Sequence, residues 1–235
     1  MDIDRSAGQG SGAAGSGERS VERQMNEFIK FPKIARYSRE CIVTEKIDGT
    51  NASIFIEAGT GRDAEALYVS DGLAMYAGSR KRWITPENDN AGFARWVLDH
   101  ADELLALGPG RHFGEWWGSK IQRTYGLVSG DKRFSMFNTI MWCLHSEEPK
   151  EIPTGDPRVT KMQTALPECV GLVPLLWRGD FAFIDVEFIL VELRTFGSKA
   201  APGFMNPEGI VIYHTAGNVS FKKTIKGDDV PKSLQ

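Results

Sequence analysis

Residues 43–57 read VTEKIDGTNASIFIE, two apolar strand-like runs that flank a polar interruption. The interruption holds Lys46, Asp48, Gly49 and Asn51, residue types that half-buried strands normally avoid. A local rule that is broken between two apolar runs indicates either a tight turn or a functional site. The stretch therefore predicts two strands whose junction carries chemistry.

The order of these polar residues suits a reactive lysine. An amine attacks only in its neutral form, so a nucleophilic lysine needs a special environment. Asp48 would lie on the same side as Lys46 if the strand continued, within reach of the lysine or of a metal ion. Gly49 permits a turn or a close backbone approach, and Asn51 adds a neutral donor. Taken alone, K-x-D-G is a weak signal, and an ordinary turn lysine is the alternative interpretation.

Length and composition bound the possible classes of protein. The chain has 235 residues, 41% of them hydrophobic, which fits one large domain or two small ones. A net charge of -3 gives no global nucleic-acid signature. Three cysteines without CxxC spacing exclude a zinc framework or a disulfide scaffold. Since neither a membrane span nor a signal peptide is recognisable, we expect a soluble cytoplasmic protein without membrane partners.

The first residues differ in composition from the remainder. Residues 1–22 are rich in glycine, serine and alanine and cannot bury apolar surface. They contain a formal GxGxxG at Gly10, Gly12 and Gly15, but no strand precedes it, so a dinucleotide site is not expected. We expect a flexible tail over 1–22 and one folded domain over 23–235.

Strand patterns outnumber helical patterns and do not alternate with them. This predicts an α+β fold with antiparallel sheets rather than a doubly wound one. The expected helices span 89–107, with Asp89 or Asn90 as the cap, and 184–196, with Gly197 as the C-cap. The expected strands span residues 41–45, 52–57, 66–70, 113–117, 134–142, 173–176, 210–214 and 219–224.

Three later stretches repeat the theme of a charged residue at the edge of a short strand. RHFGEWWGSKIQRTYG (111–126) contains Glu115, NPEGIVIYH (206–214) contains Glu208, and VSFKKTIKGD (219–228) contains Lys222 and Lys223. With Lys46, they supply an amine, two carboxylates and a cationic patch. Such a set can handle a nucleoside triphosphate together with a divalent metal ion.

The order KxDG, GE, EGIVI and a lysine strand resembles the ATP-dependent covalent nucleotidyltransferases, which are polynucleotide ligases and capping enzymes. EKIDGTN together with FGEWWGSKIQRTYG is most similar to the RNA ligase 2-like branch, of the phage type with a single catalytic domain. The resemblance covers about residues 28–228. It implies an adenylation domain of antiparallel sheets flanked by helices, similar to an ATP-grasp fold.

The resemblance implies roles for individual residues. Lys46 would attack the α-phosphate of ATP, Asp48 would be its acidic partner, and Lys222 would hold the α-phosphate. Glu208 would bind the divalent ion, magnesium or manganese. Within the nucleotide site, Asn51 would contact phosphate, Glu115 the ribose hydroxyl and Phe137 the adenine. The nucleotide-binding residues implied by the resemblance are Thr44, Glu45, Asn51, Arg80, Glu115, Phe137 and Lys223.

The chain departs from the family pattern at two positions. Asn138 stands where the family often has aspartate, so it is not expected to bind a metal ion. Thr224 stands where a second lysine is usual, and Lys223 or Lys226 is the expected substitute.

The basic segment YAGSRKRWITP (76–86) resembles the one that supplies an arginine to the site. Arg80 is the expected phosphate contact, with Lys81 and Arg82 as companions. Without the family, a solvated basic turn would be the preferred interpretation.

Two adjacent tryptophans, Trp116 and Trp117, lie on one expected strand. Alternation predicts that one is buried and the other is exposed. The four histidines share no metal-ligand spacing, and residues 147–159 read as a surface loop.

The implied reaction has three steps. Lys46 takes AMP from ATP, AMP passes to a 5′-phosphate on a nucleic-acid strand, and a 3′-hydroxyl displaces AMP. RNA is the expected substrate, and a DNA ligase or a non-catalytic nucleotide- or RNA-binding protein are the alternatives. Because the last motif ends near Gln235, we expect a monomer without an appended oligonucleotide-binding domain.

Overall fold

The computed structural model describes residues 30–59, 66–89, 91–138 and 166–227. The chain divides into two units, Met1–Ala35 and Arg36–Gln235, and the fold below is that of the larger unit. The predicted tail over 1–22, the loop over 147–159 and the end of the predicted strand over 134–142 lie outside the described residues.

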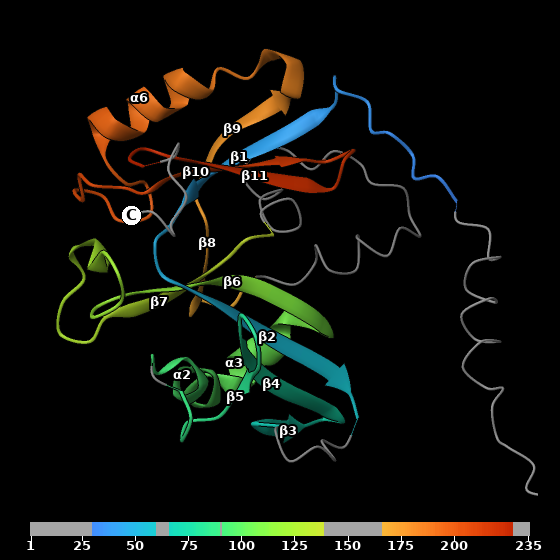
Figure 1. Cartoon of the computed structure of the whole chain (residues 1–235). Coiled ribbons are helices and arrows are strands. Elements are labelled where there is room, and N and C mark those ends of the chain that lie inside the picture. Colours follow the sequence, from blue (N-terminus) through green and yellow to red (C-terminus); the bar gives the residue numbers. More distant parts are fainter. Residues whose placement is uncertain (1–29, 60–65, 90, 139–165, 228–235) are drawn as a thin grey trace, which may run out of the picture. The chain divides into compact units, whose positions relative to one another are not determined.

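A four-stranded antiparallel sheet carries the first and last strands of this unit (Figure 1). Its order is β11 (Val219–Thr224), β10 (Gly209–His214), β1 (Glu40–Lys46) and β9 (Leu175–Asp180). Helix α6 (Val186–Phe196) covers one face and packs with alternate residues of β1, among them Cys41 and Val43. The helix begins where the Asp185 carboxylate accepts from the backbone N–H of Phe188, and it ends at Gly197.

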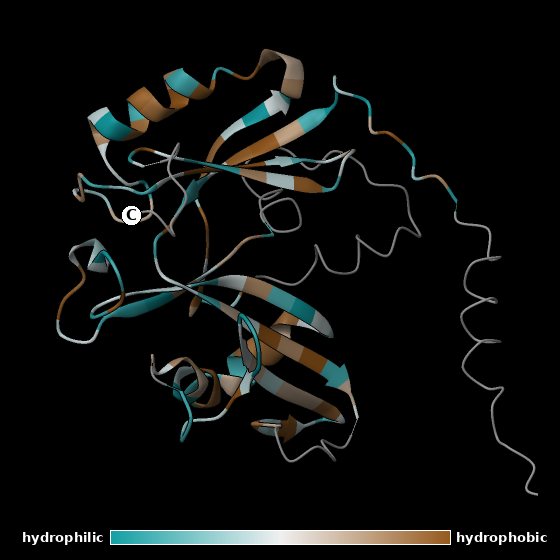
Figure 2. Cartoon of the chain, viewed as in Figure 1, coloured by the Kyte–Doolittle hydropathy of each residue, from teal (hydrophilic) through white to brown (hydrophobic). Residues whose placement is uncertain are grey.

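A seven-stranded sheet holds most of the remaining chain. Helices α2 (Phe93–Asp99) and α3 (Ala101–Leu104) pack on one face, and Figure 2 shows apolar residues along the strands and helices that enclose this core. The strands are β3 (Tyr68–Ser70), β4 (Leu73–Ser79), β2 (Thr50–Ala58), β6 (Gly110–Gly118), β7 (Lys132–Met136), β8 (Val170–Leu172) and, paired with β4, β5 (Trp83–Ile84). Among the described residues, 3-10 turns lie at Leu105–Leu107, Thr124–Gly126 and Phe181–Phe183.

The α+β prediction is confirmed, with differences in detail. The β7–β8 pair is parallel, and β4, β5 and β8 were not predicted. The strand predicted over 173–176 is confirmed only at its end, because β9 begins at Leu175 and Val173 still donates its N–H to the Met136 carbonyl beside β8. In the part of the chain that the structure describes, no helix combines the length and apolarity that a membrane crossing needs.

The helix predicted over 89–107 is shorter and broken. Backbone φ −114° and ψ 18° at His100 separate α2 from α3. Asp89 does act near the start, because its carboxylate accepts from the N–H groups of Ala91 and Ala94. The first helical residue is nevertheless Phe93, after Gly92 in the left-handed region.

Both Trp116 and Trp117 are buried, each 2% exposed, so the prediction that one is exposed is wrong. Alternation exposes a residue only where one sheet face meets water, and at Trp116 and Trp117 both faces of β6 are covered. The Trp116 ring packs against Phe93, whereas Trp117 packs against Tyr125 and donates its indole N–H to Ser135 Oγ.

Gly114 on β6 is expected to tolerate no side chain. A Cβ there would lie 2.5 Å from the Ser135 carbonyl oxygen and 2.6 Å from the Phe134 ring. We expect Gly114→Ala to lower the free energy of unfolding by about 1–3 kcal/mol, the usual cost of overpacking. Gly171→Ala on β8 is the matched control, since its Cβ would meet Ser135 Oγ at 3.4 Å, an ordinary contact. Urea denaturation of both variants checks this, and equal losses of stability would contradict it.

Candidate functional site

A pocket of about 700 Å³ is lined by residues of both sheets. On β1, alternate residues Ile42, Thr44 and Lys46 line it, because successive side chains of a strand point to opposite faces. The same alternation on β6 brings in Arg111, Phe113 and Glu115. Predicted site residues in the lining are Thr44, Glu45, Lys46, Asn51, Arg80, Glu115 and Phe137. Asp48, Glu208, Lys222 and Lys223 are not among the lining residues.

Lys46 and Glu208 form an ion pair at the edge of the pocket. Lys46 Nζ lies 2.5 Å from Glu208 Oε2, and the side chains are 25% and 8% exposed. The pairing follows from the sheet register: Lys46 lies opposite Gly209 in the β1–β10 ladder, and Glu208 directly precedes Gly209. A buried carboxylate needs such a partner, so each group holds the other in place.

The condition on which Asp48 was expected to share the lysine's side, a strand that continues past Lys46, is not met. Strand β1 ends at Lys46 and β2 begins at Thr50, so alternation does not continue to Asp48. The Asp48 carboxylate instead accepts from Arg123 Nε at 2.8 Å. Arg123 also donates to the Asn206 carbonyl at 3.0 Å, two residues before Glu208. Its guanidinium therefore connects the turn after Lys46 to the segment that carries Glu208.

The β6–β7 connection that holds Arg123 has unusual backbone geometry. Lys120, Gln122, Thr124, Tyr125 and Ser129 all have positive φ, between 43° and 62°. This left-handed region is unfavourable for residues with a Cβ and persists only where the surroundings impose it. The sequence gives no sign of it, since these residues are not glycines.

Tyr125 supplies part of that restraint. Its ring is 2% exposed and packs against Trp117 and Phe204, and its hydroxyl accepts from the Asp48 backbone N–H at 2.8 Å. Burial raises the pKa of the Tyr125 hydroxyl, so it stays protonated at neutral pH. Neither Arg123 nor Tyr125 was predicted as a site residue, although both lie in the quoted stretch over 111–126.

Glu115 is buried at the wall of the pocket. Its Oε1 accepts from the Gly49 N–H and its Oε2 from Asn51 Nδ2, both at 3.1 Å. Gly49 reaches β6 because it has no side chain: a Cβ there would lie 2.5 Å from the Trp116 carbonyl oxygen. Burial raises the pKa of Glu115 to about 7, although both hydrogen bonds and Lys46 lower it. This carboxylate therefore changes charge near neutral pH.

The raised pKa of Glu115 predicts a pH-dependent stability. In the unfolded chain this carboxyl has its ordinary pKa of 4.5, but in the folded protein it keeps its proton up to about pH 7. Folding therefore binds a proton in this window, so the stabilisation present below pH 4.5 is lost as the pH rises to 7. Relative to Glu115→Gln, the wild type should lose about 2–3 kcal/mol between pH 5 and pH 8.

Urea denaturation of the two proteins at four pH values within this window measures the difference. Glu192→Gln, an exposed carboxylate change on α6, is the control and should follow the wild type. Parallel stability profiles of the wild type and Glu115→Gln would contradict the buried, raised-pKa carboxyl.

The Glu45 side chain points away from the pocket. It is 1% exposed, and its carboxylate accepts from Ser198 Oγ at 2.6 Å and from the N–H groups of Lys199 and Ala200. Burial raises the pKa of Glu45, and these three hydrogen bonds oppose the shift. The Glu45 carboxylate thus holds the α6–β10 connection in place. Only the other atoms of Glu45 can line the pocket.

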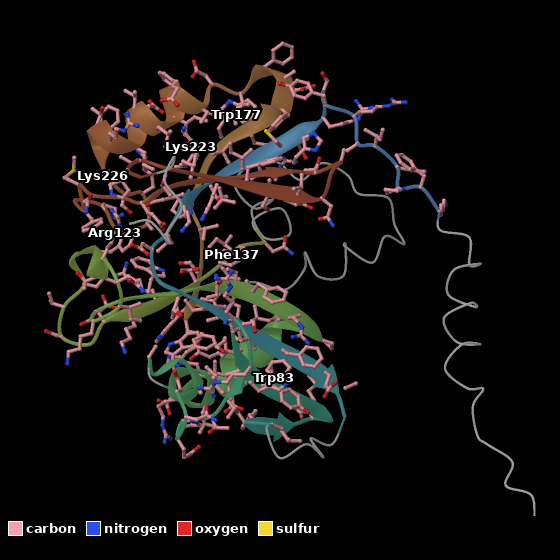
Figure 3. The ribbon with its side chains drawn as sticks, in the orientation of Figure 1. Trp83, Arg123, Phe137, Trp177, Lys223 and Lys226 are labelled. Atoms are coloured by element: carbon pink, nitrogen blue, oxygen red, sulfur yellow. The ribbon has the colours of Figure 1, made fainter. Side chains whose placement is uncertain are left out.

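Strand β11 presents its two lysines on opposite faces. Lys222 lies opposite Val211, and Ser220 lies opposite Tyr213; Val211, Tyr213 and Ser220 all line the pocket. Lys222 therefore shares the pocket face of the sheet, whereas Lys223 belongs to the other face, which α6 covers (Figure 3). The register thus favours Lys222 and disfavours Lys223 as a pocket contact.

Arg80 and Phe137 lie at strand ends next to the pocket. Arg80 follows β4 and is exposed, and Phe137 follows β7 with 42% of its surface exposed. Figure 3 shows Phe137 in the space between the two sheets. A second pocket aromatic, Phe113, is 54% exposed and was not predicted.

The carboxylates fit a divalent ion only together with a ligand. Among the described residues, no three or more histidine, cysteine, aspartate or glutamate side chains cluster as a metal centre. Glu208 and Glu115 are near enough that the charge of Glu208 raises the pKa of Glu115. Magnesium accepts one or two carboxylates when phosphates and waters complete its shell, so the donor set fits an ion that arrives with a phosphate ligand.

A family model described as RNA ligase matches residues 39–226. The chain belongs to the RNA ligase family. The matched RNA ligase segment runs from the start of β1 to just beyond β11, and so contains every site residue described above.

Individual relatives of this RNA ligase family member are distant or short matches. Protein nucleotidyltransferase YdiU of Pectobacterium atrosepticum is 30% identical over 81 residues, which are 34% of this chain and 17% of that protein. A Naegleria gruberi RNA ligase mutant with ATP and Mn is 18% identical with a TM-score of 0.48. The same ligase with PPi is also 18% identical, with a TM-score of 0.48.

The shared length with those structures is limited. The matches cover 80% of this chain, and 49% and 50% of the two Naegleria chains. The chain thus spans about half the length of the solved ligases that it matches.

Proposed function

We propose that this chain is an ATP-dependent RNA ligase that joins a 5′-phosphate to a 3′-hydroxyl through a lysyl–AMP intermediate on Lys46. The observation that carries the proposal is the ion pair between Lys46 and Glu208 at a pocket that also holds Arg80, Glu115 and Phe137. Membership of the RNA ligase family supports the reaction class. An ordinary turn lysine is solvated, whereas Lys46 pairs with a buried carboxylate beside a pocket that is large enough for a nucleotide.

In the first step, the Lys46 amine attacks the α-phosphorus of ATP. A nitrogen–phosphorus bond forms as the bond to pyrophosphate breaks, and the ammonium gives up two protons in all, so that the nitrogen keeps one in the phosphoramidate. In the resting site Glu208 balances the ammonium charge, and at 2.5 Å it is a near acceptor for a proton. A bound magnesium or manganese ion would neutralise phosphate charge next to Glu208.

The remaining residues position the nucleotide. Phe137, exposed at the pocket, offers a ring face for adenine, and Glu115 can accept from a ribose hydroxyl once it is ionised. Arg80 and Lys222 supply positive charge for phosphates from opposite sheets. Because phosphoryl-type transfers depend mainly on positioning and charge neutralisation, such groups account for most of the catalysis. After transfer, a 5′-phosphate takes AMP from Lys46, and a 3′-hydroxyl then displaces AMP.

We expect the protein to become covalently labelled by ATP with magnesium, and poorly by GTP or NAD. Incubation with each nucleotide labelled on the α-phosphate or adenylate, followed by a denaturing gel, measures this directly. Equal labelling by GTP would indicate a capping-type enzyme instead. No label from any nucleotide would favour a non-catalytic nucleotide-binding protein.

The choice of strand needs its own experiment. Nicked duplexes with RNA or DNA on either side of the nick, and single strands with a 5′-phosphate, are offered to the labelled protein. Sealing only where RNA carries the 3′-hydroxyl supports an RNA ligase. Equal sealing of all-DNA nicks would make the protein a DNA ligase.

A further inference from the structure

A cluster of stacked side chains extends outward from Arg111, at the edge of the nucleotide pocket, and has no part in the proposed reaction. The Arg111 guanidinium lies 4.6 Å from the centre of the Phe55 ring and 5.0 Å from that of Trp83. The Phe55 and Trp83 rings stack with an interplanar angle of 19°, and both contact Tyr76. We call Phe55, Tyr76, Trp83 and Arg111 the Arg111 cluster.

The Arg111 cluster continues the floor of the pocket. Phe55 lies opposite Arg111 on β6 and opposite Tyr76 on β4, so the three side chains share one face of the sheet. Two residues earlier on the same face of β2 is Ser53, which lines the pocket, as do Arg111 and Phe113. One surface therefore runs from Glu115 through Phe113 to the cluster.

The Trp83 indole lies flat on this surface because Gly78 lies beneath it. A Cβ at Gly78 would lie 3.1 Å from the Trp83 ring and 2.6 Å from Ser53 Oγ. Any larger residue would lift the indole from the sheet. Trp83 is only half-buried and Arg111 is exposed, so core packing does not account for the stack.

The charge around the cluster is positive on the side of the pocket. Arg80, Lys81 and Arg82, all exposed, form the turn between β4 and Trp83. Arg82 donates to the Trp83 and Asn88 carbonyls, which fixes this turn beside the indole. Glu57, next on the same face of β2, marks the far end of the surface.

We propose that the Arg111 cluster binds an unpaired base of the RNA strand whose end is being joined, with the neighbouring phosphate on the basic turn. The inference rests on the proposed function. A guanidinium held flat over two rings presents its own planar face, and bases stack on such planes and on aromatic rings. Alternation of a stacking surface with basic side chains is the pattern of single-strand binding sites. Because the surface joins the pocket, a strand seated there would have its end near Lys46.

The test measures binding of an unstructured, fluorescent, 5′-phosphorylated 12-nucleotide RNA by anisotropy. Trp83→Leu and Phe55→Leu keep apolar volume but remove the ring face, and each should weaken binding about tenfold, as loss of one base-stacking contact predicts. Phe188→Leu on α6 is the matched control, an aromatic residue 59% exposed and remote from the pocket lining, and should bind as the wild type does. Labelling by ATP is measured in parallel and should stay within about twofold, since neither Trp83 nor Phe55 lines the pocket.

Two variants of Arg111 distinguish the contribution of stacking to RNA binding from that of charge. Arg111→Lys keeps the charge but loses the planar group, so RNA binding should weaken with an unchanged salt dependence. Arg111→Met should also lower the slope of log K against log salt by about 0.7, the value for one phosphate contact on a single strand. If a leucine variant fails to fold, as judged by its thermal melt, Arg111→Lys decides the question alone.

The outcomes distinguish the inference from the proposed function. Unchanged RNA affinity in Trp83→Leu, Phe55→Leu and Arg111→Lys would overturn the inference, even where ATP labels the protein normally. Weakened RNA binding in a protein that ATP never labels would retain the inference and overturn the proposed function. If binding of a DNA strand of the same sequence weakens equally in Trp83→Leu, the result supports base stacking, because stacking does not distinguish ribose from deoxyribose.

Discussion

Lys46→Ala is expected to abolish transfer of label from ATP to the protein, a loss limited only by the background of the assay. No other described lysine has its amine paired with Glu208, so Lys222 and Lys199 cannot take over the attack. Sealing of RNA that is already adenylylated should persist within about tenfold, because that step bypasses the lysyl–AMP intermediate. Label transfer, sealing of pre-adenylylated RNA and thermal melting are measured on the same preparation.

The stability of Lys46→Ala should fall only modestly. The change leaves the Glu208 carboxylate, 8% exposed, without its partner, at a cost of about 1–2 kcal/mol. Lys199→Ala is the matched control, since that exposed lysine bonds Glu45 through its backbone N–H, which alanine retains. Label on Lys46→Ala after addition of ATP would refute the assignment of the nucleophile.

Glu208→Gln should reduce the rate of labelling by about 100-fold or more while the fold persists. Glutamine keeps the shape of the side chain but cannot balance the Lys46 charge or bind a divalent ion as a carboxylate does. Partial recovery at high manganese concentration would indicate that ion binding is the larger role. The exposed carboxylate change Glu192→Gln should label normally, and a labelling rate of Glu208→Gln within a few-fold of the wild type would argue against any role for the carboxylate.

The meeting of Lys46, Asn51 and Glu115 follows from short-range patterns. Asn51 and Glu115 are direct partners in the β2–β6 ladder, and Lys46 ends the strand just before it. The same alternation could have predicted that Glu45 faces away, because Thr44 and Lys46 on either side of it line the pocket. The position of Glu45 between two pocket-facing residues is thus a signal that the sequence itself contains.

Other features have no short-range signal. The bridge made by Arg123 joins residues separated by 75 and 83 positions, through a loop whose left-handed residues are not glycines. Strand β4 was missed because Asp71 and Gly72 at its start and the basic run after it resemble a loop, although Leu73–Ser79 pairs fully with β2. The parallel β7–β8 pair depends on residues after the segment over 139–165, which no local pattern links to β7.

The strand order of the smaller sheet also sets when the Lys46–Glu208 pair can form. Strand β1 is the first of the unit to be synthesised, yet its two neighbours in the sheet, β9 and β10, are among the last. Lys46 and Glu208 are separated by 162 positions. During synthesis, the Lys46 amine therefore has no Glu208 carboxylate to pair with until most of the chain has left the ribosome. Contacts of such separation form late in folding, because the loop between them must be closed first. The Lys46–Glu208 pair therefore forms only after β10 has been made, so an unfinished chain carries the lysine without its partner.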